Sequence, residues 1–182
     1  MTETAIEAPT GERIRLRFVT RAELPKFLRH AKRDAGGFND FGVTQRKIPD
    51  DAWTDGELRS EQRAELFIER LEDGAILGTI QYHRVSYGPN PESAAWMLGI
   101  ELSPSARGQG YGTEAQRLLS DWLFATTPTN RVEASTDVDN VAEVRALEKA
   151  GFSREGVSRG AQFRAGAYRD LIGFSRLRDD LG

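Results

Sequence analysis

A glycine-rich turn between two apolar segments of different period constrains this chain more than any other feature. Before the turn, residues 97–102 form a short apolar run that stops at Ser103-Pro104, as a β-strand does. The turn itself is Arg-Gly-Gln-Gly-Tyr-Gly, residues 107–112. After it, apolar residues recur at the spacing of one helix face, namely Ala115, Leu118, Leu119, Trp122 and Leu123. The sequence therefore predicts a strand, a glycine-rich loop and a helix in direct succession.

This junction has the properties of a phosphate-binding site. The first amides of a helix lack intrahelical partners, and the helix dipole places roughly half a positive charge beside them. Glycines at alternate positions let the backbone approach an anion closely, and Arg107 adds donors suited to phosphate oxygens. A P-loop would need a lysine where Thr113-Glu114 stands, and a dinucleotide fingerprint would need a third glycine in place of Thr113. A turn whose glycines serve its geometry alone stays open as the alternative.

Composition indicates a globular protein that works without cysteine chemistry. The 182 residues carry a formal net charge of −3, which argues against nucleic acid as a partner. We expect a cytoplasmic protein with no membrane partner, because no apolar run approaches the roughly 20 residues of a membrane span and no signal peptide opens the chain. The absence of cysteine excludes disulfides, thiolate metal ligands and a cysteine nucleophile. We expect a flexible tail over residues 1–12 and a single domain over residues 13–182.

Residues 107–112 resemble the Q/R-x-x-G-x-G/A signature of the GCN5-related N-acetyltransferases (GNAT), whose backbone amides hold the pyrophosphate of coenzyme A. Further segments resemble the RimJ/RimL-like subgroup, which acetylates the N-termini of ribosomal proteins and related amines: Asp139-Asn140 and residues 148–152, 155–157 and 166–170. The resemblance is specific from about Gly99 to Leu177. It implies an α+β (mixed α/β) fold with a central, twisted, mostly antiparallel sheet that splays between its fourth and fifth strands, and with helices on both faces.

The other elements follow from periodicity and turn residues. Alternating apolar residues predict a strand over 14–18, and residues 20–23 have the form of a capping box before a helix that ends at 34–37. A hairpin around residues 72–74 joins predicted strands at 64–71 and 75–87. Further predicted strands are 93–102, 132–136, 152–159 and 167–177, with a turn at 160–166, and a helix runs from a cap at 137–140 to Ala150. Residues 38–59 have no clear period, and their acids suit either an amine-attracting loop or a solvated surface.

The resemblance implies acetyl-coenzyme A as the cofactor, held by three groups of residues. The pyrophosphate would lie against Arg107 and the backbone amides of Gly108, Gln109, Gly110, Tyr111, Gly112 and Thr113. Ile100 and Leu102 would lend backbone hydrogen bonds to the pantetheine arm. Asn140 matches the family's asparagine that contacts the cofactor, and it also fits a helix N-cap. No metal is expected, since the two histidines lack metal-ligand spacing.

The implied reaction is transfer of an acetyl group to a primary amine, on a peptide N-terminus or a small molecule, by direct attack in a ternary complex. An alkyl ammonium has a pKa near 10.4, so freeing its lone pair at pH 7 costs about 4.6 kcal/mol. A base must supply part of this free energy. Glu101 is the first candidate, because an acid on this strand can face the cleft, and Glu133, Asp137 and His83 are weaker candidates.

The general acid and the acceptor stay open. The subgroup often has a serine three residues after the asparagine as the acid that reprotonates the leaving thiolate, and Glu143 stands there instead. No acid is assigned, since a thiol pKa near 8.5 makes the thiolate a fair leaving group without one. A module that binds coenzyme A but has lost its chemistry is the alternative function, and a nucleotide-phosphate binder of another fold is the third. A homodimer is left open as well.

Overall fold

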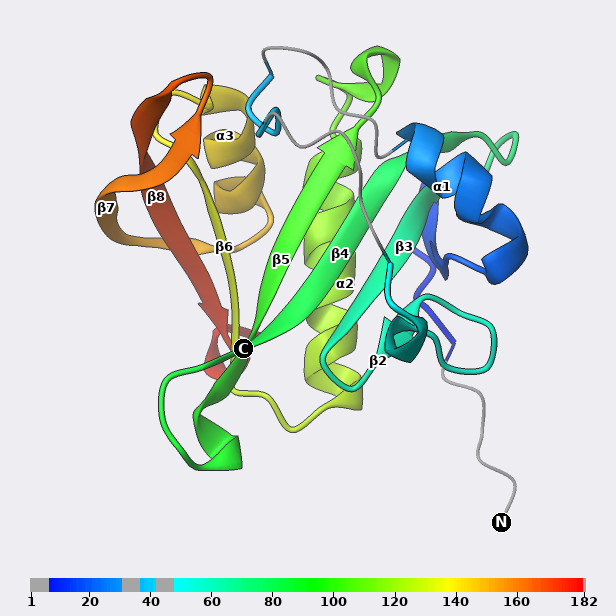
Figure 1. Ribbon diagram of the computed structural model, residues 1–182, viewed down its shortest axis with the longest axis horizontal. Helices are drawn as coiled ribbons and strands as arrows, with labels where there is room; N and C mark the ends of the chain where they lie inside the picture. The colour runs from blue at the N-terminus through cyan, green and yellow to red at the C-terminus, as the bar shows by residue number, and fades with distance from the viewer. Residues whose placement is uncertain (1–6, 31–36, 42–47, 182) are drawn as a thin grey trace.

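The structure is a computed structural model that describes residues 7–30, 37–41 and 48–181 (Figure 1). In these residues eight strands form one sheet in the order β1-β3-β4-β5-β6-β8-β7, with β2 paired to β3 beside this path. Neighbouring strands are antiparallel except β5 and β6, which are parallel. The strands are β1 (Ile14–Phe18), β2 (Arg59–Ser60), β3 (Arg63–Arg70), β4 (Ile76–Ser86), β5 (Ala94–Leu102), β6 (Arg131–Asp137), β7 (Ser153–Arg164) and β8 (Ala167–Leu177).

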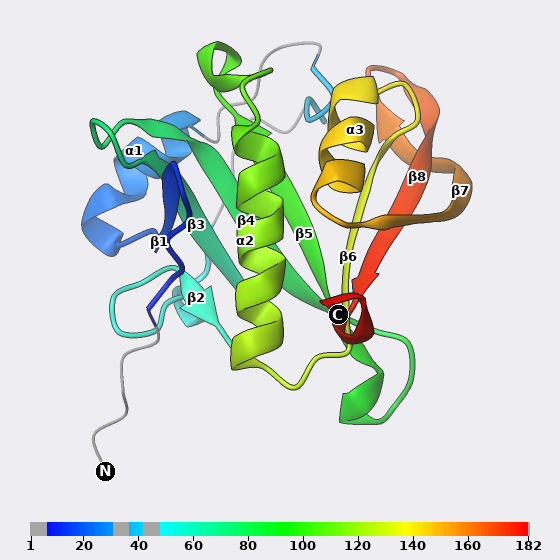
Figure 2. The same ribbon diagram turned by 180° about the vertical axis from the view of Figure 1, so that it is seen from behind.

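Helices cover both faces of the sheet. One face carries α2 and α3 and the other carries α1, as the two opposite views show (Figure 1, Figure 2). In β3, Leu66 and Ile68 belong to the larger apolar core, which includes α2, whereas Phe67 packs edge-on against Phe27 with ring centroids 6.2 Å apart. Because successive residues of a strand point to opposite faces, one strand serves two cores. The helices are α1 (Leu24–His30), α2 (Tyr111–Thr126) and α3 (Val141–Lys149).

The helix predicted after the glycine-rich loop is confirmed as α2, which runs along the middle of the sheet (Figure 2). The centre of its predicted apolar stripe is fully buried, at Ala115, Leu119 and Leu123. Trp122 packs beside them and donates a hydrogen bond from Nε1 to the Glu7 carbonyl at 2.9 Å. The described part of the expected tail, from Glu7 on, thus contacts the domain. Residues 1–6 lie outside the described residues.

Most predicted strands agree with the structure to within one residue at each end, but the turn predicted over residues 160–166 is wrong. β7 continues to Arg164, and the turn consists of Ala165 (φ +51°) and Gly166 (φ +77°). Two residues with positive φ form the tight hairpin turn that matches the twist of its strands. Gly160 lies instead inside β7, where the pairing with β8 is irregular. The predicted end of the first helix falls largely on residues 31–36, outside the described part.

The sheet splays where the resemblance implied, between the strands now numbered β5 and β6. Their pairing is limited to Trp96–Leu98 of β5 and Val132–Ala134 of β6. In the described part of the chain, every helix is too short or too polar to cross a membrane.

Candidate active site

The last residues of β5 form an open edge inside the sheet. Residues 99–102 extend beyond the pairing with β6, while β4 continues alongside on the other side. Backbone N–H and C=O groups on such an edge can pair with an extended ligand, in the way that an added strand does. This stretch of β5 is therefore suited to bind a ligand that carries amides.

The loop after β5 leads into α2 through two glycines with positive φ. A short 3₁₀ turn, Pro104–Ala106, is followed by Gly108 (φ +73°) and by Gly110 (φ +83°), the N-cap of α2. The left-handed backbone conformation is open to glycine at little cost, which explains the residue type at both positions. The Glu114 N–H donates to the Gly110 carbonyl as the helix begins. The amides of residues 111–113 precede this bond and lack intrahelical acceptors, so they are available to an anion.

Arg13, just before β1, holds the loop from outside. Its Nη1 donates to the Gln109 carbonyl at 3.0 Å, and its Nε donates to Glu114 Oε2 at 3.0 Å. The other carboxylate oxygen of Glu114 accepts the Arg13 backbone N–H at 2.8 Å, and the guanidinium lies over the Tyr111 ring. Glu114 is buried, and these charge-assisted hydrogen bonds satisfy its carboxylate. The position of the loop thus depends on a contact with the start of the sheet.

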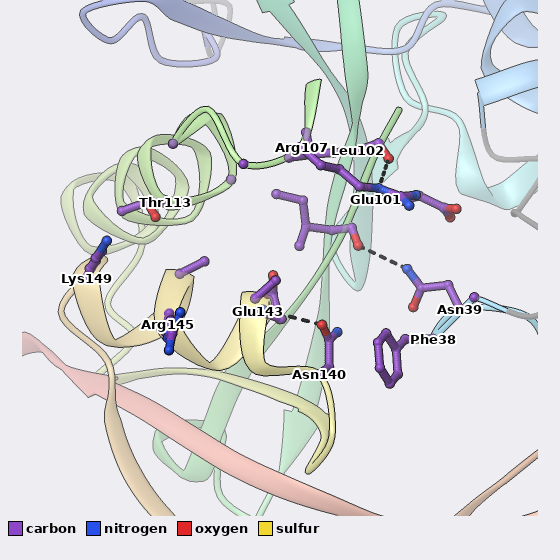
Figure 3. A pocket seen from close by; sticks show the side chains of 17 residues that line it. Phe38, Asn39, Glu101, Leu102, Arg107, Thr113, Asn140, Glu143, Arg145 and Lys149 are labelled. Carbon is purple, nitrogen blue, oxygen red and sulfur yellow. Dashed lines mark hydrogen bonds between the residues drawn. The ribbon is translucent and has the colours of Figure 1, made fainter. Parts of the chain in front are cut away.

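The open edge of β5, the loop and α3 enclose a cavity of about 670 Å³ (Figure 3). One side of it carries Thr113, Arg145 and Lys149, and the other carries Glu101, Asn39 and Phe38. The first side adjoins the N-terminus of α2 and suits phosphates, whereas the second offers a carboxylate and an amide. The lining residues are Gly37, Phe38, Asn39, Ile100, Glu101, Leu102, Arg107, Gly108, Gly110, Gly112, Thr113, Asn140, Ala142, Glu143, Arg145, Ala146 and Lys149.

Asn140 both caps α3 and lines the cavity. Its Oδ1 accepts the backbone N–H of Glu143 at 3.4 Å, and its Nδ2 donates to Thr136 Oγ1 at 3.0 Å. The two interpretations of this asparagine are therefore compatible, because the cap fixes its side chain at the wall of the cavity.

Two side chains already contact carbonyl groups at the end of β5. Asn39 Nδ2 donates to the Ile100 carbonyl at 3.3 Å, and Arg107 Nε donates to the Leu102 carbonyl at 3.0 Å. The segment that carries Asn39 is also held from β7, because Arg164 Nη1 donates to the Gly37 carbonyl at 3.4 Å. Residues 37–39 are thus held at the cavity by contacts with β5 and β7, which are distant from them in the sequence.

The acids near the site have different surroundings. Glu133 is buried with Arg131, at 2.6 Å from its Nε, and accepts a hydrogen bond from the Tyr87 hydroxyl at 2.7 Å. Asp137 is buried in an ion pair with Arg164. For Glu143, burial raises the pKa to about 7, and a hydrogen bond with the Gln116 side chain opposes this rise. Among the described acids near the site, Glu143 thus has a pKa raised close to neutral pH.

A family model described as the acetyltransferase (GNAT) domain matches residues 13–153, more than half of the chain. The chain belongs to the GNAT family. The residues that match the family model include β5, the glycine-rich loop, α2 and the cap of α3.

Curated relatives match this chain over part of their length. "Probable N-acetyltransferase YjcK" of Bacillus subtilis (strain 168) is 30% identical over 102 residues, which are 56% of this chain and 55% of that protein. A kanamycin resistance protein of Rhizobium radiobacter is 32% identical over 68 residues, 36% of this chain and 63% of that protein. The chain thus spans about half the length of YjcK.

Solved structures agree with the GNAT fold over nearly the whole chain. A spermidine N-acetyltransferase from Vibrio cholerae, in complex with CoA and spermine, has a TM-score of 0.77 at 15% identity and covers 94% of this chain and 100% of that one. A ribosomal-protein-S5-alanine acetyltransferase from Vibrio fischeri has a TM-score of 0.73 at 18% identity and covers 97% and 99%. At these identities the likeness concerns the fold.

The structure brings most of the residues predicted for the GNAT site to one cavity. They are Ile100, Glu101, Leu102, Arg107, Gly108, Gly110, Gly112, Thr113 and Asn140. Gln109 and Tyr111 are not part of its lining: Gln109 Nε2 turns back to the Ser105 carbonyl at 2.6 Å, and Tyr111 is buried in the core. His83, Glu133 and Asp137, the weaker base candidates, are likewise outside the lining of this cavity. The roles of all these residues stay predictions.

Two walls of the cavity were not predicted from the sequence. Residues 142, 145, 146 and 149 recur at the spacing of one helix face after the Asn140 cap, a signal that could have identified them. Residues 37–39 give no such signal, because they lie at the predicted end of the first helix and in the following segment without a clear period.

Proposed function

We propose that this GNAT protein transfers the acetyl group of acetyl-coenzyme A to a primary amine, by direct attack in a ternary complex. The observation that carries the proposal is one cavity that joins the N-terminus of α2 to the open edge of β5. Coenzyme A combines a diphosphate with an extended arm that contains amides. It therefore needs an anion site and a strand edge side by side, and the cavity offers both.

The residues that would hold the ligand follow from this arrangement. The backbone amides of residues 108–113 would bind the diphosphate, and Ile100 and Leu102 would present backbone groups to the pantetheine arm. Arg145 and Lys149 add positive charge on the same side of the cavity as the start of α2. This charge suits a ligand with several phosphate oxygens.

The chain itself would supply two catalytic groups, a proton acceptor and a hydrogen-bond donor. Bound acetyl-coenzyme A supplies an acyl group that is already activated as a thioester. Glu101, on the wall next to Asn39, accepts a proton from the substrate ammonium, and a backbone amide of β5 stabilises negative charge on the carbonyl oxygen. Since the chain has no cysteine, an acetyl-cysteine intermediate is excluded, which favours direct attack by the amine.

The acceptor is a primary amine of undefined class. The similar proteins carry names that refer to spermidine, to ribosomal-protein alanine and to kanamycin resistance. Each of these names suggests a different acceptor, so the proposal is limited to the primary amino group that these acceptors share.

The test is a measurement of thiol release from acetyl-coenzyme A with a panel of amines. The panel contains an alanine-terminated peptide, spermidine and kanamycin, and binding of coenzyme A is measured in parallel by calorimetry. We expect binding together with amine-dependent thiol release. Binding without release for a broad amine panel would favour the inactive coenzyme A-binding module, and absence of binding would reject the proposed function.

A further inference from the structure

Glu143 lies in the first turn of α3 and points into the cavity, in the space between α3 and β5 (Figure 3). The Asn140 cap fixes its backbone, since the Glu143 N–H donates to the cap oxygen. On the same helix face, Ala142 and Ala146 also line the cavity and are too small to shield the carboxyl group from a ligand there. A molecule that fills the space between α3 and β5 must therefore meet this carboxyl group.

Among the described residues, no charged side chain shifts the pKa of Glu143, and the partial positive charge at the N-terminus of α3 opposes the effect of its burial. On the neighbouring strand β6, Asp137 is already paired with Arg164. The hydrogen-bonding partner of Glu143 is the side-chain amide of Gln116 on α2, which is uncharged and buried. From β5 and the following loop, the charged residues of the lining are Glu101 and Arg107, and Arg107 Nε is bound to the Leu102 carbonyl. From α3 they are Arg145 and Lys149, which are exposed and lie on the side of Thr113.

A ligand in the cavity changes the balance between the two forms of this group. It removes water from the carboxyl group, and removal of water disfavours the charged form. A ligand with phosphates adds further negative charge to the same cavity, which also disfavours a carboxylate. The neutral form, by contrast, can donate a hydrogen bond to an oxygen of the ligand, which a carboxylate cannot do.

We propose that Glu143 is a cofactor-binding residue that acts in its protonated form: it donates a hydrogen bond to the amide-bearing arm of coenzyme A, and binding takes up a proton from solvent. The inference rests on the proposed function, because it assumes that coenzyme A occupies this cavity. It adds a proton-linked contact to the binding of that ligand. Burial prepares the group for this role by raising the pKa of Glu143 to about 7 before the ligand arrives.

The sign of the pH dependence follows from linkage. Below pH 7 the free protein already carries the proton, and the affinity is nearly constant. Above pH 7 the free protein has lost it, so binding must recapture a proton and the affinity falls by up to about tenfold per pH unit. The fall ends at the higher pKa that Glu143 has in the complex.

The test compares wild type with Glu143→Gln, which keeps the shape of the side chain and cannot titrate. Coenzyme A is titrated calorimetrically at pH 7.5 in Tris and in PIPES, buffers whose ionisation enthalpies differ, and dephospho-coenzyme A is used in a second series to remove the 3′-phosphate. At pH 7.5 a group with a pKa of about 7 is roughly one-quarter protonated, so we expect wild type to take up as much as about three-quarters of a proton more than the variant with both ligands. Glu148→Gln is the matched control, because Glu148 lies on α3 outside the lining and pairs with Arg154 at 2.7 Å. It should behave as wild type does.

Equal proton uptake by wild type and Glu143→Gln, with both proteins binding coenzyme A, would overturn the inference and leave the proposed function intact. Absence of coenzyme A binding in wild type at every pH would overturn both. A carbon-13 titration of the Glu143 carboxyl group in the wild-type protein provides evidence that does not depend on a variant. A midpoint near 7 that rises when coenzyme A is added supports the inference, whereas a midpoint near the ordinary value of 4.5 contradicts it.

Discussion

The two loop glycines with positive φ differ in their surroundings. A side chain at Gly108 would meet no atom within 4 Å, whereas a Cβ at Gly110 would lie 3.1 Å from Arg13 Nη2. Gly110 is also the N-cap of α2, so its conformation directs the first amides of the helix. It is therefore the position at which the shape of the proposed diphosphate site is most easily tested.

Gly110→Val should weaken coenzyme A binding by about tenfold or more, because it strains a left-handed backbone and pushes against the arginine that holds the loop. Gly166→Val is the control: it has a similar positive φ and lies in the hairpin turn between β7 and β8, with open space around its Cβ. Both variants should lose some thermal stability. Calorimetry should show the loss of binding in the first variant alone, and unchanged affinity in it would contradict the assigned loop.

Glu101→Gln should lower kcat by about a hundredfold at neutral pH, the usual order for loss of a general base. The loss should be largest near pH 6, where nearly all substrate is ammonium, and smaller near pH 9, where free amine is available without help. A pH–rate profile of both proteins, with coenzyme A affinity as the control for intact binding, checks this. Parallel profiles would remove Glu101 from the role of base.

At the scale of elements, the loop depends on the contact between the start of β1 and the first turn of α2. The carboxylate of Glu114 accepts three hydrogen bonds across this contact. Two come from the backbone N–H groups of Arg13 and Ile14, at 2.8 and 3.3 Å, and the third comes from the Arg13 side chain. The contact joins residues about a hundred positions apart in the sequence. It couples the outermost strand on this side of the sheet to the proposed anion site.

Glu114→Ala should reduce the free energy of unfolding by about 2–4 kcal/mol, because two backbone N–H groups lose their acceptor at a buried position. It should also weaken coenzyme A binding, since Arg13 no longer has the carboxylate that directs it to the loop. Glu72→Ala, at an exposed position in the β3–β4 turn, is the control and should leave both quantities nearly unchanged. Urea denaturation and calorimetry provide the two measurements.

The elements that the sequence predicted well are those whose signals are local. The run before Ser103-Pro104, the loop glycines and the stripe of α2 each show their role within a few residues. The turn of the last hairpin was misplaced because Gly160, a natural turn residue, lies at an irregular point inside β7 instead. Asn39 could not be predicted at the cavity, because its position depends on contacts with β5 and β7.

At the scale of the whole molecule, acids with opposite pKa shifts shape stability against pH. Hydrogen bonds from arginines lower the pKa values of Glu23 and Glu155 to about 2, so their stabilisation is present above about pH 4.5 and is lost as pH falls toward 2. Burial raises the pKa of Glu143, which has the opposite effect. In the window from 4.5 to about 7 the folded chain keeps a proton that the unfolded chain has released, so stability falls as pH rises.

The difference in unfolding free energy between Glu143→Gln and wild type should therefore change with pH. The variant should gain about 1–3 kcal/mol relative to wild type between pH 5 and pH 8, because it has no partly buried carboxyl group that loses hydration when it ionises. Urea denaturation at several pH values measures this difference, in which the common contributions of Glu23 and Glu155 cancel. A constant difference across this window would show that Glu143 titrates normally in the folded protein.

The brief pairing of β5 with β6 has a mechanical consequence. The sheet consists of two panels, β1-β3-β4-β5 and β6-β8-β7, which are joined along only three residue pairs in the described strands. By the proposed function, the arm of coenzyme A would lie between the panels and lengthen this seam with its own amides. We therefore expect ligand binding to stiffen both halves of the molecule at once, so that the protein is more rigid and more stable when its ligand is abundant.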